Sequence, residues 1–242
     1  MIRFEEVWKS FNGNAVLKGL NLHLPKGRIS VILGPSGEGK SVLLKHMIGL
    51  IRPDRGRVVV DGTDLATLGD REINEFRKKF GMLFQNAALF DSFDVEDNVA
   101  FPLREHTDLS DEEIARRVKE KLTLVGLEAA LDKMPSELSG GMRKRVGLAR
   151  AIALEPSIIL YDEPTTGLDP LMTDTINRLI VDTHNKTGVT SVIISHDIEA
   201  TFQVADHVAM LHEGVIIENG APEAFRKSRH PFVRRFLERQ GD

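Results

Sequence analysis

The sequence contains no cysteine and no long run of apolar residues. Without cysteine the chain forms no disulfides and no cysteine-ligated metal sites, which fits a reducing compartment. Its apolar stretches fall short of the roughly 20 residues that a helix needs to cross a bilayer, and its first residues lack the apolar core of a secretory signal. We therefore expect a cytoplasmic protein that relies on another chain for any membrane span.

A strong net charge of either sign is also missing. The 32 basic and 36 acidic residues nearly cancel, which leaves a formal net charge of -4. The chain therefore lacks the overall basic field of nucleic-acid binders, although the basic run at residues 143–145 leaves a local contact open. With 242 residues, 41% of them hydrophobic, it can form one α/β domain, alone or with a smaller subdomain.

Hydrophobic periodicity predicts the order of the elements. Residues 2–24 alternate around a turn at Asn12-Gly13, which is typical of antiparallel strands. The apolar run at 29–33 predicts a strand that leads through a loop into a helix, and the runs at 157–161 and 190–195 are typical of buried parallel strands. The charged stretch at 108–126 predicts helix, with Ser110 as N-cap and Glu113 as its capping-box partner. The sequence thus predicts an α/β core with a helical subdomain.

A phosphate-binding motif lies between the apolar run at 29–33 and a helical pattern. It fits G-x-x-x-x-G-K-[ST], in which glycines allow backbone N–H groups to surround phosphate oxygens at a helix N-terminus. We expect Lys40 to reach the β- and γ-phosphates of ATP and Ser41 to bind Mg²⁺. The motif and the residue after it form the expected nucleotide site: Gly34, Pro35, Ser36, Gly37, Glu38, Gly39, Lys40, Ser41 and Val42.

Two carboxylates follow the apolar run at 157–161. Asp162 is expected to emerge at the carboxyl edge of the sheet, where ligands of such folds bind, and to hold Mg²⁺ through water. Glu163 is the candidate general base, because a carboxylate beside the γ-phosphate can orient and polarise the attacking water. A solvated turn is the alternative interpretation of this acidic pair.

The segment Leu138-Ser139-Gly140-Gly141-Met142 resembles the LSGGQ signature of ABC ATPases, with methionine in place of the usual glutamine. That resemblance covers essentially the whole chain. It implies the P-loop ABC ATPase fold, with an antiparallel β subdomain, a helical subdomain at about 86–155 and a short C-terminal helix at about 222–240. It also implies a homodimer in which each chain presents Ser139, Gly140 and Gly141 to ATP on its partner.

The resemblance assigns further residues in the family's order. Gln85 corresponds to the glutamine that bridges Mg²⁺, the attacking water and the membrane subunit. Asp169 corresponds to an aspartate that crosses the dimer interface, and His196 to a histidine that contacts the γ-phosphate. Phe11 stands where the family stacks an aromatic ring on adenine, with Trp8 as the weaker candidate. The catalytic set is then Glu163, His196, Gln85 and Lys40, and the metal set Ser41, Gln85 and Asp162.

Two segments, residues 82–90 and 97–107, are similar to the MlaF group, the ATPases of MCE-type lipid transporters. This similarity implies phospholipid transport at the cytoplasmic face of a bacterial inner membrane. The implied partners are MlaE-like permease subunits, a periplasmic MlaD-like MCE-domain protein and an MlaB-like STAS-domain protein, with no nucleic acid. A cleft at Leu89, Phe90 and Phe93 is the expected permease contact; packing of the helical subdomain is the alternative.

Other functions stay open at this point. The chain could serve a transporter for an amino acid, an ion or another small molecule. It could also be a soluble ABC-type scaffold that closes on ATP without a permease. The apolar face of Phe232, Val233, Phe236 and Leu237 could pack on its own domain or on the other protomer.

Overall fold

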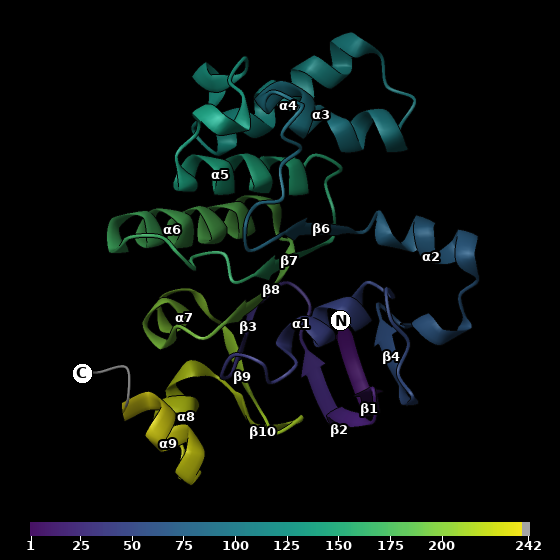
Figure 1. Ribbon diagram of the computed structural model, residues 1–242, viewed down its shortest axis with the longest axis vertical. Coiled ribbons are helices and arrows are strands. Elements are labelled where there is room, and N and C mark those ends of the chain that lie inside the picture. The colour runs from purple at the N-terminus through teal and green to yellow at the C-terminus, as the bar shows by residue number, and fades with distance from the viewer. Residues whose placement is uncertain (239–242) are drawn as a thin grey trace. The chain divides into compact units, whose positions relative to one another are not determined.

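The computed structural model describes residues 1–238; the predicted C-terminal helix extends to residue 240, so its last two positions lie outside this part. By its internal contacts the chain divides into two compact units. Unit 1 comprises residues 1–77 and the segment from 190 onwards, and unit 2 comprises residues 78–189. Both units combine helices with strands (Figure 1).

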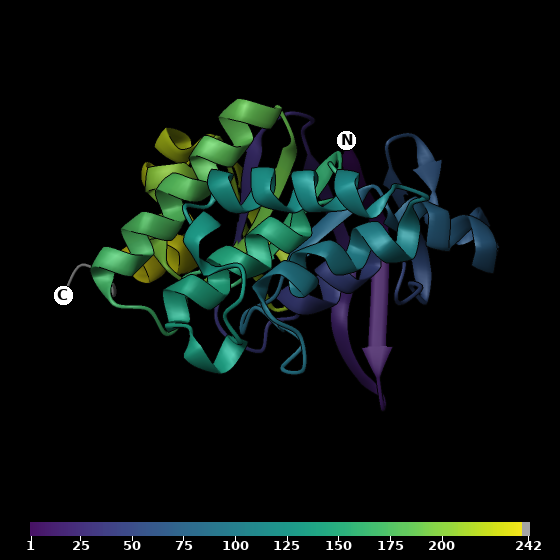
Figure 2. The same ribbon diagram turned by 90° about the horizontal axis from the view of Figure 1, so that it is seen from above.

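The N-terminal part of unit 1 is an antiparallel sheet. Strands β1 (Ile2–Phe11) and β2 (Asn14–Leu24) pair around the predicted turn, where Asn12 and Gly13 both have positive φ. These two strands are the long purple ribbons of Figure 2. Strands β4 (Arg55–Val60) and β5 (Thr63–Asp64) complete the order β2-β1-β4-β5. The alternation at residues 2–24 therefore correctly predicted a half-buried antiparallel sheet.

The second sheet of unit 1 positions the phosphate motif. Strand β3 (Ile29–Leu33) pairs in parallel with β8 (Thr190–Ser195) and β9 (His207–His212), and β10 (Val215–Gly220) pairs antiparallel with β9. Every residue of β3 and β8 is buried, which explains why neither strand shows the alternation of a half-buried strand.

The helices of unit 1 are short and lie at the ends of these strands. They are α1 (Lys40–Met47), the 3₁₀ turn η1 (Leu65–Thr67), α2 (Asp70–Arg77), α7 (Ile198–Val204), α8 (Pro222–Arg226) and α9 (Pro231–Glu238). Val233 of α9 is fully buried within its own unit, and Phe232 stacks on His212 of β9. The apolar face of the C-terminal helix therefore packs on its own chain.

Unit 2 holds two parallel strands and most of the helical residues. Strands β6 (Phe80–Leu83) and β7 (Ile158–Asp162) pair directly. The helices are α3 (Val95–His106), α4 (Asp111–Leu124), α5 (Gly140–Ala151) and α6 (Pro170–Thr187), with 3₁₀ turns η2 (Glu128–Ala130) and η3 (Pro135–Glu137). Helices α3, α4 and α5 contact one another (Figure 2).

Side-chain caps fix where the helices of unit 2 begin. The hydroxyl of Ser110 accepts from the Glu113 N–H, and that of Ser139 accepts from the Met142 N–H, both at 3.3 Å. The Ser110 N-cap is as the sequence predicted. The Asp94 and Asp169 carboxylates cap α3 and α6 in the same way. Each cap satisfies one of the N–H groups that a helix leaves free at its start.

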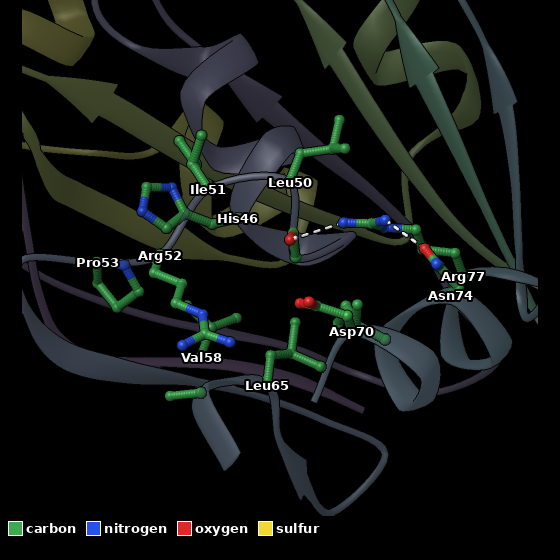
Figure 3. Close-up of a pocket in the computed structure, with 13 residues that line it drawn as sticks. His46, Leu50, Ile51, Arg52, Pro53, Val58, Leu65, Asp70, Asn74 and Arg77 are labelled. Atoms are coloured by element: carbon green, nitrogen blue, oxygen red, sulfur yellow. Dashed lines mark hydrogen bonds between the residues drawn. The ribbon is translucent and has the colours of Figure 1, made fainter. Parts of the chain in front are cut away.

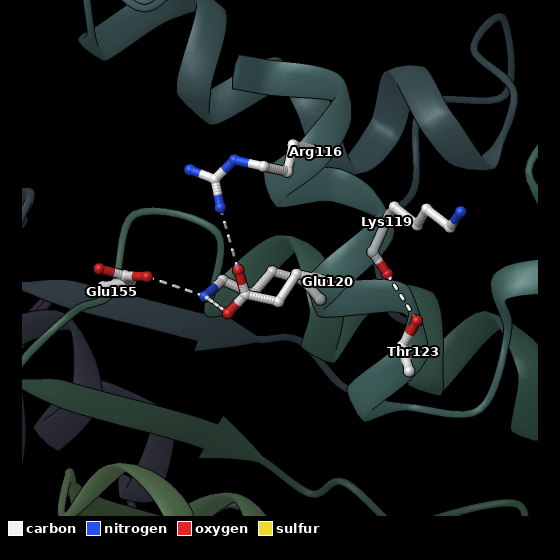
Figure 4. Close-up of polar contacts among 6 residues, drawn as sticks. Arg116, Lys119, Glu120, Thr123 and Glu155 are labelled. Carbon is white, nitrogen blue, oxygen red and sulfur yellow. Dashed lines mark hydrogen bonds and ion pairs between the residues drawn. The ribbon is translucent and has the colours of Figure 1, made fainter. Parts of the chain in front are cut away.

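A buried lysine ties α4 to the segment before β7. The Lys121 side chain is 6% exposed, and its Nζ lies 2.9 Å from a Glu155 oxygen and 3.2 Å from a Glu120 oxygen. Arg116 approaches Glu120 from one turn earlier on α4 (Figure 4). Because a buried ammonium needs compensating partners, these two carboxylates allow the lysine stem to pack in the interior.

The observed architecture is the mixed α/β class that the sequence predicted, with an antiparallel sheet and a helical part. Within residues 1–238, we find no helix with both the length and the apolar character of a bilayer span.

Candidate functional site

The phosphate motif forms the connection between β3 and α1. Gly39, the residue before α1, has φ 97°, and the helix start has no side-chain cap. A Cβ on Gly39 would lie 2.7 Å from Val16, and one on Gly34 would lie 2.5 Å from the Leu211 carbonyl oxygen. Both positions therefore require glycine. The uncapped N-terminus of α1 is suited to an anion.

Lys40 lies along the inside of this loop. It is 5% exposed, and its Nζ donates to the carbonyl oxygens of Gly34 at 2.7 Å and Pro35 at 2.9 Å. The loop thus holds one buried positive charge next to its glycine backbone. Ser41 is exposed at the first turn of α1. This arrangement can bind phosphate, as the motif predicts.

Phe11 and Trp8 lie on β1 in the same unit and are both 42% exposed. The Trp8 ring covers Gly19 of β2, where a Cβ would lie 3.2 Å from the indole. Phe11 stands at the hairpin turn, with the Lys9 Nζ 5.5 Å from its ring centroid. The two adenine candidates are therefore equally exposed.

His196 follows β8, also in unit 1, and is half-buried. The next residue, Asp197, caps α7 by accepting from the Ala200 N–H, and its own N–H donates to the Ser195 hydroxyl. These bonds hold the backbone on the C-terminal side of His196, so a defined turn carries the imidazole.

The acidic pair lies at the end of β7 in unit 2. Asp162 is the last residue of the strand, and Glu163 has φ 47°, a left-handed conformation that costs a non-glycine residue on the order of 1–3 kcal/mol. The Thr166 hydroxyl donates to Oε2 of Glu163 at 3.0 Å. The Glu163 carboxylate is therefore held in one direction, as a positioned base requires.

Lys144 supports the same turn from α5. Its Nζ lies 3.3 Å from the Glu163 carbonyl oxygen and 3.4 Å from that of Thr166. Burial lowers the pKa of Lys144, and the negative charge of Glu163 opposes that shift. Sequence reasoning missed this role, because Lys144 stands in a basic run that looks like a solvated surface.

The other two side chains of that basic run also donate to backbone carbonyl oxygens of unit 2. Arg143 donates to the Leu138 carbonyl oxygen at 2.6 Å, and Arg145 donates to those of Val125 and Gly126 at 3.2 and 3.4 Å. All three basic side chains therefore have partners within unit 2.

The glycine-rich segment begins α5. Ser139 is exposed, whereas Gly141 is buried, and a Cβ on Gly141 would lie 3.0 Å from the Met172 sulfur. Asp169 is also exposed and accepts from the Met172 N–H at 3.0 Å as the cap of α6. The segment and Asp169 thus lie against the same first turn of α6.

Gln85 is exposed two residues after β6, close in sequence to a cluster of aromatic rings. Phe90, Phe93 and Phe101 form this phenylalanine cluster, with ring centroids 4.8 to 6.1 Å apart. Phe90 is 40% exposed, and the Arg150 guanidinium lies 5.6 Å from its ring centroid. Of the three residues of the expected permease contact, Phe90 is exposed, whereas Leu89 and Phe93 are half-buried.

Asn98 fixes the loop that carries two of these rings. It is fully buried, and its Oδ1 accepts from the Phe90 N–H at 2.8 Å. Its Nδ2 donates to the carbonyl oxygens of Phe90, Phe93 and Asp94 at 2.8 to 3.1 Å. One amide side chain thus satisfies four backbone groups.

A separate cavity of about 330 Å³ lies in unit 1 at the C-terminal end of α1 (Figure 3). Arg77 lines this cavity. It donates to the carbonyl oxygens of Ile48 and Gly49 and to the Asn74 side chain. Those bonds engage the guanidinium within the protein. The phosphate motif lies at the other end of α1.

Comparison with known proteins gives relatives along nearly the whole chain. A mycobacterial protein named "Probable ribonucleotide transport ATP-binding protein mkl" (Mycobacterium tuberculosis) is 48% identical over 229 residues. That match covers 95% of this chain but only 64% of the mycobacterial protein. The "Intermembrane phospholipid transport system ATP-binding protein MlaF" of Haemophilus influenzae is 44% identical, covering 94% of this chain and 86% of that protein. MlaF of Escherichia coli K12 is 40% identical over 238 residues.

Solved structures share the fold. The ATP-binding cassette MJ0796, in a dimeric post-hydrolysis state bound to ADP and Pi, superposes with a TM-score of 0.84 at 32% identity, covering 92% of this chain and 99% of that one. CbiO1 of Clostridium perfringens, part of the cbiONQ complex, gives a TM-score of 0.85 at 32% identity over 98% of both chains. The family described as ABC transporter matches residues 17–166. This chain, with the ABC ATPase fold, therefore belongs to the ABC transporter family.

Proposed function

We propose that this chain binds and hydrolyses ATP as the nucleotide-binding subunit of a membrane transporter. The observation that carries the proposal is the loop between β3 and α1, with its two required glycines, its uncapped helix start and the buried charge of Lys40. These features suit a chain of phosphates. The family match supports the same reading.

The proposed roles follow the chemistry of each side chain. Lys40 and the backbone N–H groups of the loop bind the β- and γ-phosphates, and Phe11 stacks on adenine. Ser41 would hold Mg²⁺, with Asp162 through water and with Gln85. When bound, Mg²⁺ supplies positive charge that neutralises the phosphate oxygens.

Glu163 acts as the general base in this proposal. The bond from Thr166 holds its carboxylate, which can then accept a proton from the attacking water. His196, at the end of β8, contacts the γ-phosphate.

We propose that two copies of the chain form the working unit. Ser139, Gly140 and Gly141 of one copy bind ATP held by the phosphate loop of the other, and Asp169 lies at the interface. The exposure of Ser139 and Asp169 supports this proposal, as does the dimeric state in which MJ0796 is described. Such contacts close the dimer on ATP, and hydrolysis removes them.

The phenylalanine cluster is the proposed contact for a permease. Its exposed Phe90, held by Asn98 and Arg150, offers a rigid aromatic surface near Gln85 in sequence. A short amphipathic helix with apolar side chains suits this surface. Closure and reopening of the dimer would then move the permease.

Phospholipid is the proposed cargo, moved between the inner and outer membranes by an MCE-type system. The MlaF relatives, whose names specify intermembrane phospholipid transport, support it. The partners would be MlaE-like permease subunits, an MlaD-like MCE-domain protein and an MlaB-like STAS-domain protein, with this chain at the cytoplasmic face of the inner membrane. The mkl name favours a second candidate cargo, a ribonucleotide.

Affinity purification of the chain from mildly solubilised source membranes tests the proposal. Mass spectrometry should identify a multispanning permease, an MCE-domain protein and bound phospholipid. A permease with a different cargo would overturn the lipid assignment. Soluble partners alone would replace the transporter proposal with that of a scaffold ATPase.

A further inference from the structure

The phosphate loop contains a carboxylate that its proposed ligand would repel. Glu38 stands between Gly37 and Gly39, in the loop that we propose surrounds the phosphates. A negative charge free to turn toward bound phosphate would weaken binding. In the structure, two contacts from the hairpin that joins β9 and β10 hold the Glu38 carboxylate.

These contacts engage both carboxylate oxygens. Oε2 accepts from the Glu213 backbone N–H at 2.6 Å, and Oε1 lies 3.1 Å from Nδ1 of His212. An ionised carboxylate only accepts hydrogen bonds, so Nδ1 of His212 must carry the proton and donate. The two side chains are only 20% and 23% exposed, which strengthens the contact relative to a surface pair.

A phenylalanine of the C-terminal helix packs on one face of the His212 imidazole ring. The rings of His212 and Phe232 are stacked, with centroids 3.5 Å apart and planes 14° from parallel. Phe236 stacks in turn on Phe232, with centroids 6.1 Å apart. Val233, the residue after Phe232, is fully buried and anchors α9. The orientation of the His212 ring therefore depends on α9.

Contacts with β2, and not with α9, hold the backbone that follows His212. Gly214 has φ 83°, a Cβ there would lie 2.5 Å from the Val16 carbonyl oxygen, and the Lys18 N–H donates to the Gly214 oxygen at 3.0 Å. The hairpin is thus attached to β2. Loss of Phe232 would free the imidazole ring without moving the strand that carries it.

We propose that α9 acts on the nucleotide site through Phe232 and His212, which hold the Glu38 carboxylate away from bound phosphate. Both are positioning residues. Nucleotide affinity then depends on whether α9 is docked, which makes the C-terminal helix a regulatory element of the phosphate loop. The inference rests on the proposed nucleotide site.

The test measures the Kd for MgADP by titration calorimetry on the full chain. His212→Ala and Phe232→Ala should each weaken binding by about fivefold or more, the lower end of typical coupling between two sites. His212→Asn, whose amide can replace the lost donor, should stay close to wild type. Phe202→Ala serves as a control for the loss of a phenyl ring in the same unit, because that ring contacts Phe225 and Arg226 of α8 and does not stack on His212; its Kd should stay close to wild type.

The decisive variant combines Glu38→Gln with His212→Ala. If His212 acts by restraining a negative charge, removal of that charge should restore the Kd to within about twofold of Glu38→Gln alone. A double variant as weak as His212→Ala would overturn the proposal, because the loss would then come from general damage to the loop. Wild-type affinity in Phe232→Ala would overturn the role of α9. Wild-type protein that binds no MgADP would instead contradict the proposed function itself.

Discussion

The backbone of Glu163 is left-handed, a conformation that is strained for a residue other than glycine. Its neighbours Thr166 and Lys144 bind the carboxylate and the carbonyl oxygen of this residue, so the strained turn is held on both sides. Strain that the surroundings maintain is common where a side chain must be aimed. Here it aims a carboxylate, in agreement with the proposed general base.

We expect Glu163→Gln to lower the ATP turnover rate by on the order of 10²–10⁴-fold, because an amide cannot accept the proton. ATP-bound dimers should persist and can be measured by size-exclusion chromatography with light scattering. Glu155→Gln is a suitable control, since Glu155 also has a positive φ but lies before β7. Turnover near wild type in Glu163→Gln would reject the assignment.

Asn98 gives a residue-scale prediction about stability. Asn98→Ala leaves the Phe90 N–H and three carbonyl oxygens without this partner. We expect the free energy of unfolding to fall by about 2–3 kcal/mol, the cost of unsatisfied buried polar groups. Urea denaturation measures it, with the exposed Asn74→Ala expected to change stability by no more than about 0.5 kcal/mol. Equal effects of the two changes would contradict the role of Asn98.

At the scale of elements, an ion pair between Lys121 and Glu155 joins α4 to the segment before β7. The Lys121 side chain is buried, whereas that of Glu155 is exposed. The hydrogen bond from Lys121 holds the pKa of Glu155 below its usual value of 4.5. A lowered pKa means that the contribution to stability is present above pH 4.5 and is lost as the pH falls through the lower, folded-state value. The Glu155 side chain is 60% exposed, so solvent screens the pair.

Lys121→Met should therefore remove a small, pH-dependent increment of stability. We expect the free energy of unfolding of wild type to fall more than that of Lys121→Met as the pH drops from about 5 to below the folded-state pKa of Glu155, by at most about 1 kcal/mol. Urea denaturation at each pH gives the difference. Parallel pH curves would show that the pair contributes nothing to folding.

The elements that the sequence predicted best are those whose pattern is local. Fully buried strands such as β3 and β8 lack the alternation of a half-buried strand, and the Ser110 cap lies three residues from its partner. The contact of Glu38 with His212 joins residues 174 positions apart. No periodicity or spacing indicates such a contact.

The same distinction applies within the candidate site. The phosphate motif is contiguous, so its placement between β3 and α1 could be predicted from the sequence. Lys144 could not be identified as a support for Glu163, because only the fold shows which lysine of a basic run is buried. The sequence pattern reports residue type, whereas burial depends on tertiary packing.

At the scale of the whole molecule, family membership and the phosphate loop point to an ATPase, and the MlaF and mkl relatives point to transport. The chain spans 64% of the length of the mycobacterial relative. We propose that this chain binds and hydrolyses ATP, whereas a membrane partner provides the path for the cargo.

The most direct measurement of that claim is the ATPase rate of the chain, alone and in a permease complex captured from source membranes and returned to lipid bilayers. We predict Mg²⁺-dependent hydrolysis that is faster in the complex and that Glu163→Gln lowers by on the order of 10²–10⁴-fold in both samples. Equal rates with and without the permease would contradict coupling to a transporter. Absence of hydrolysis in an intact complex would contradict the ATPase assignment.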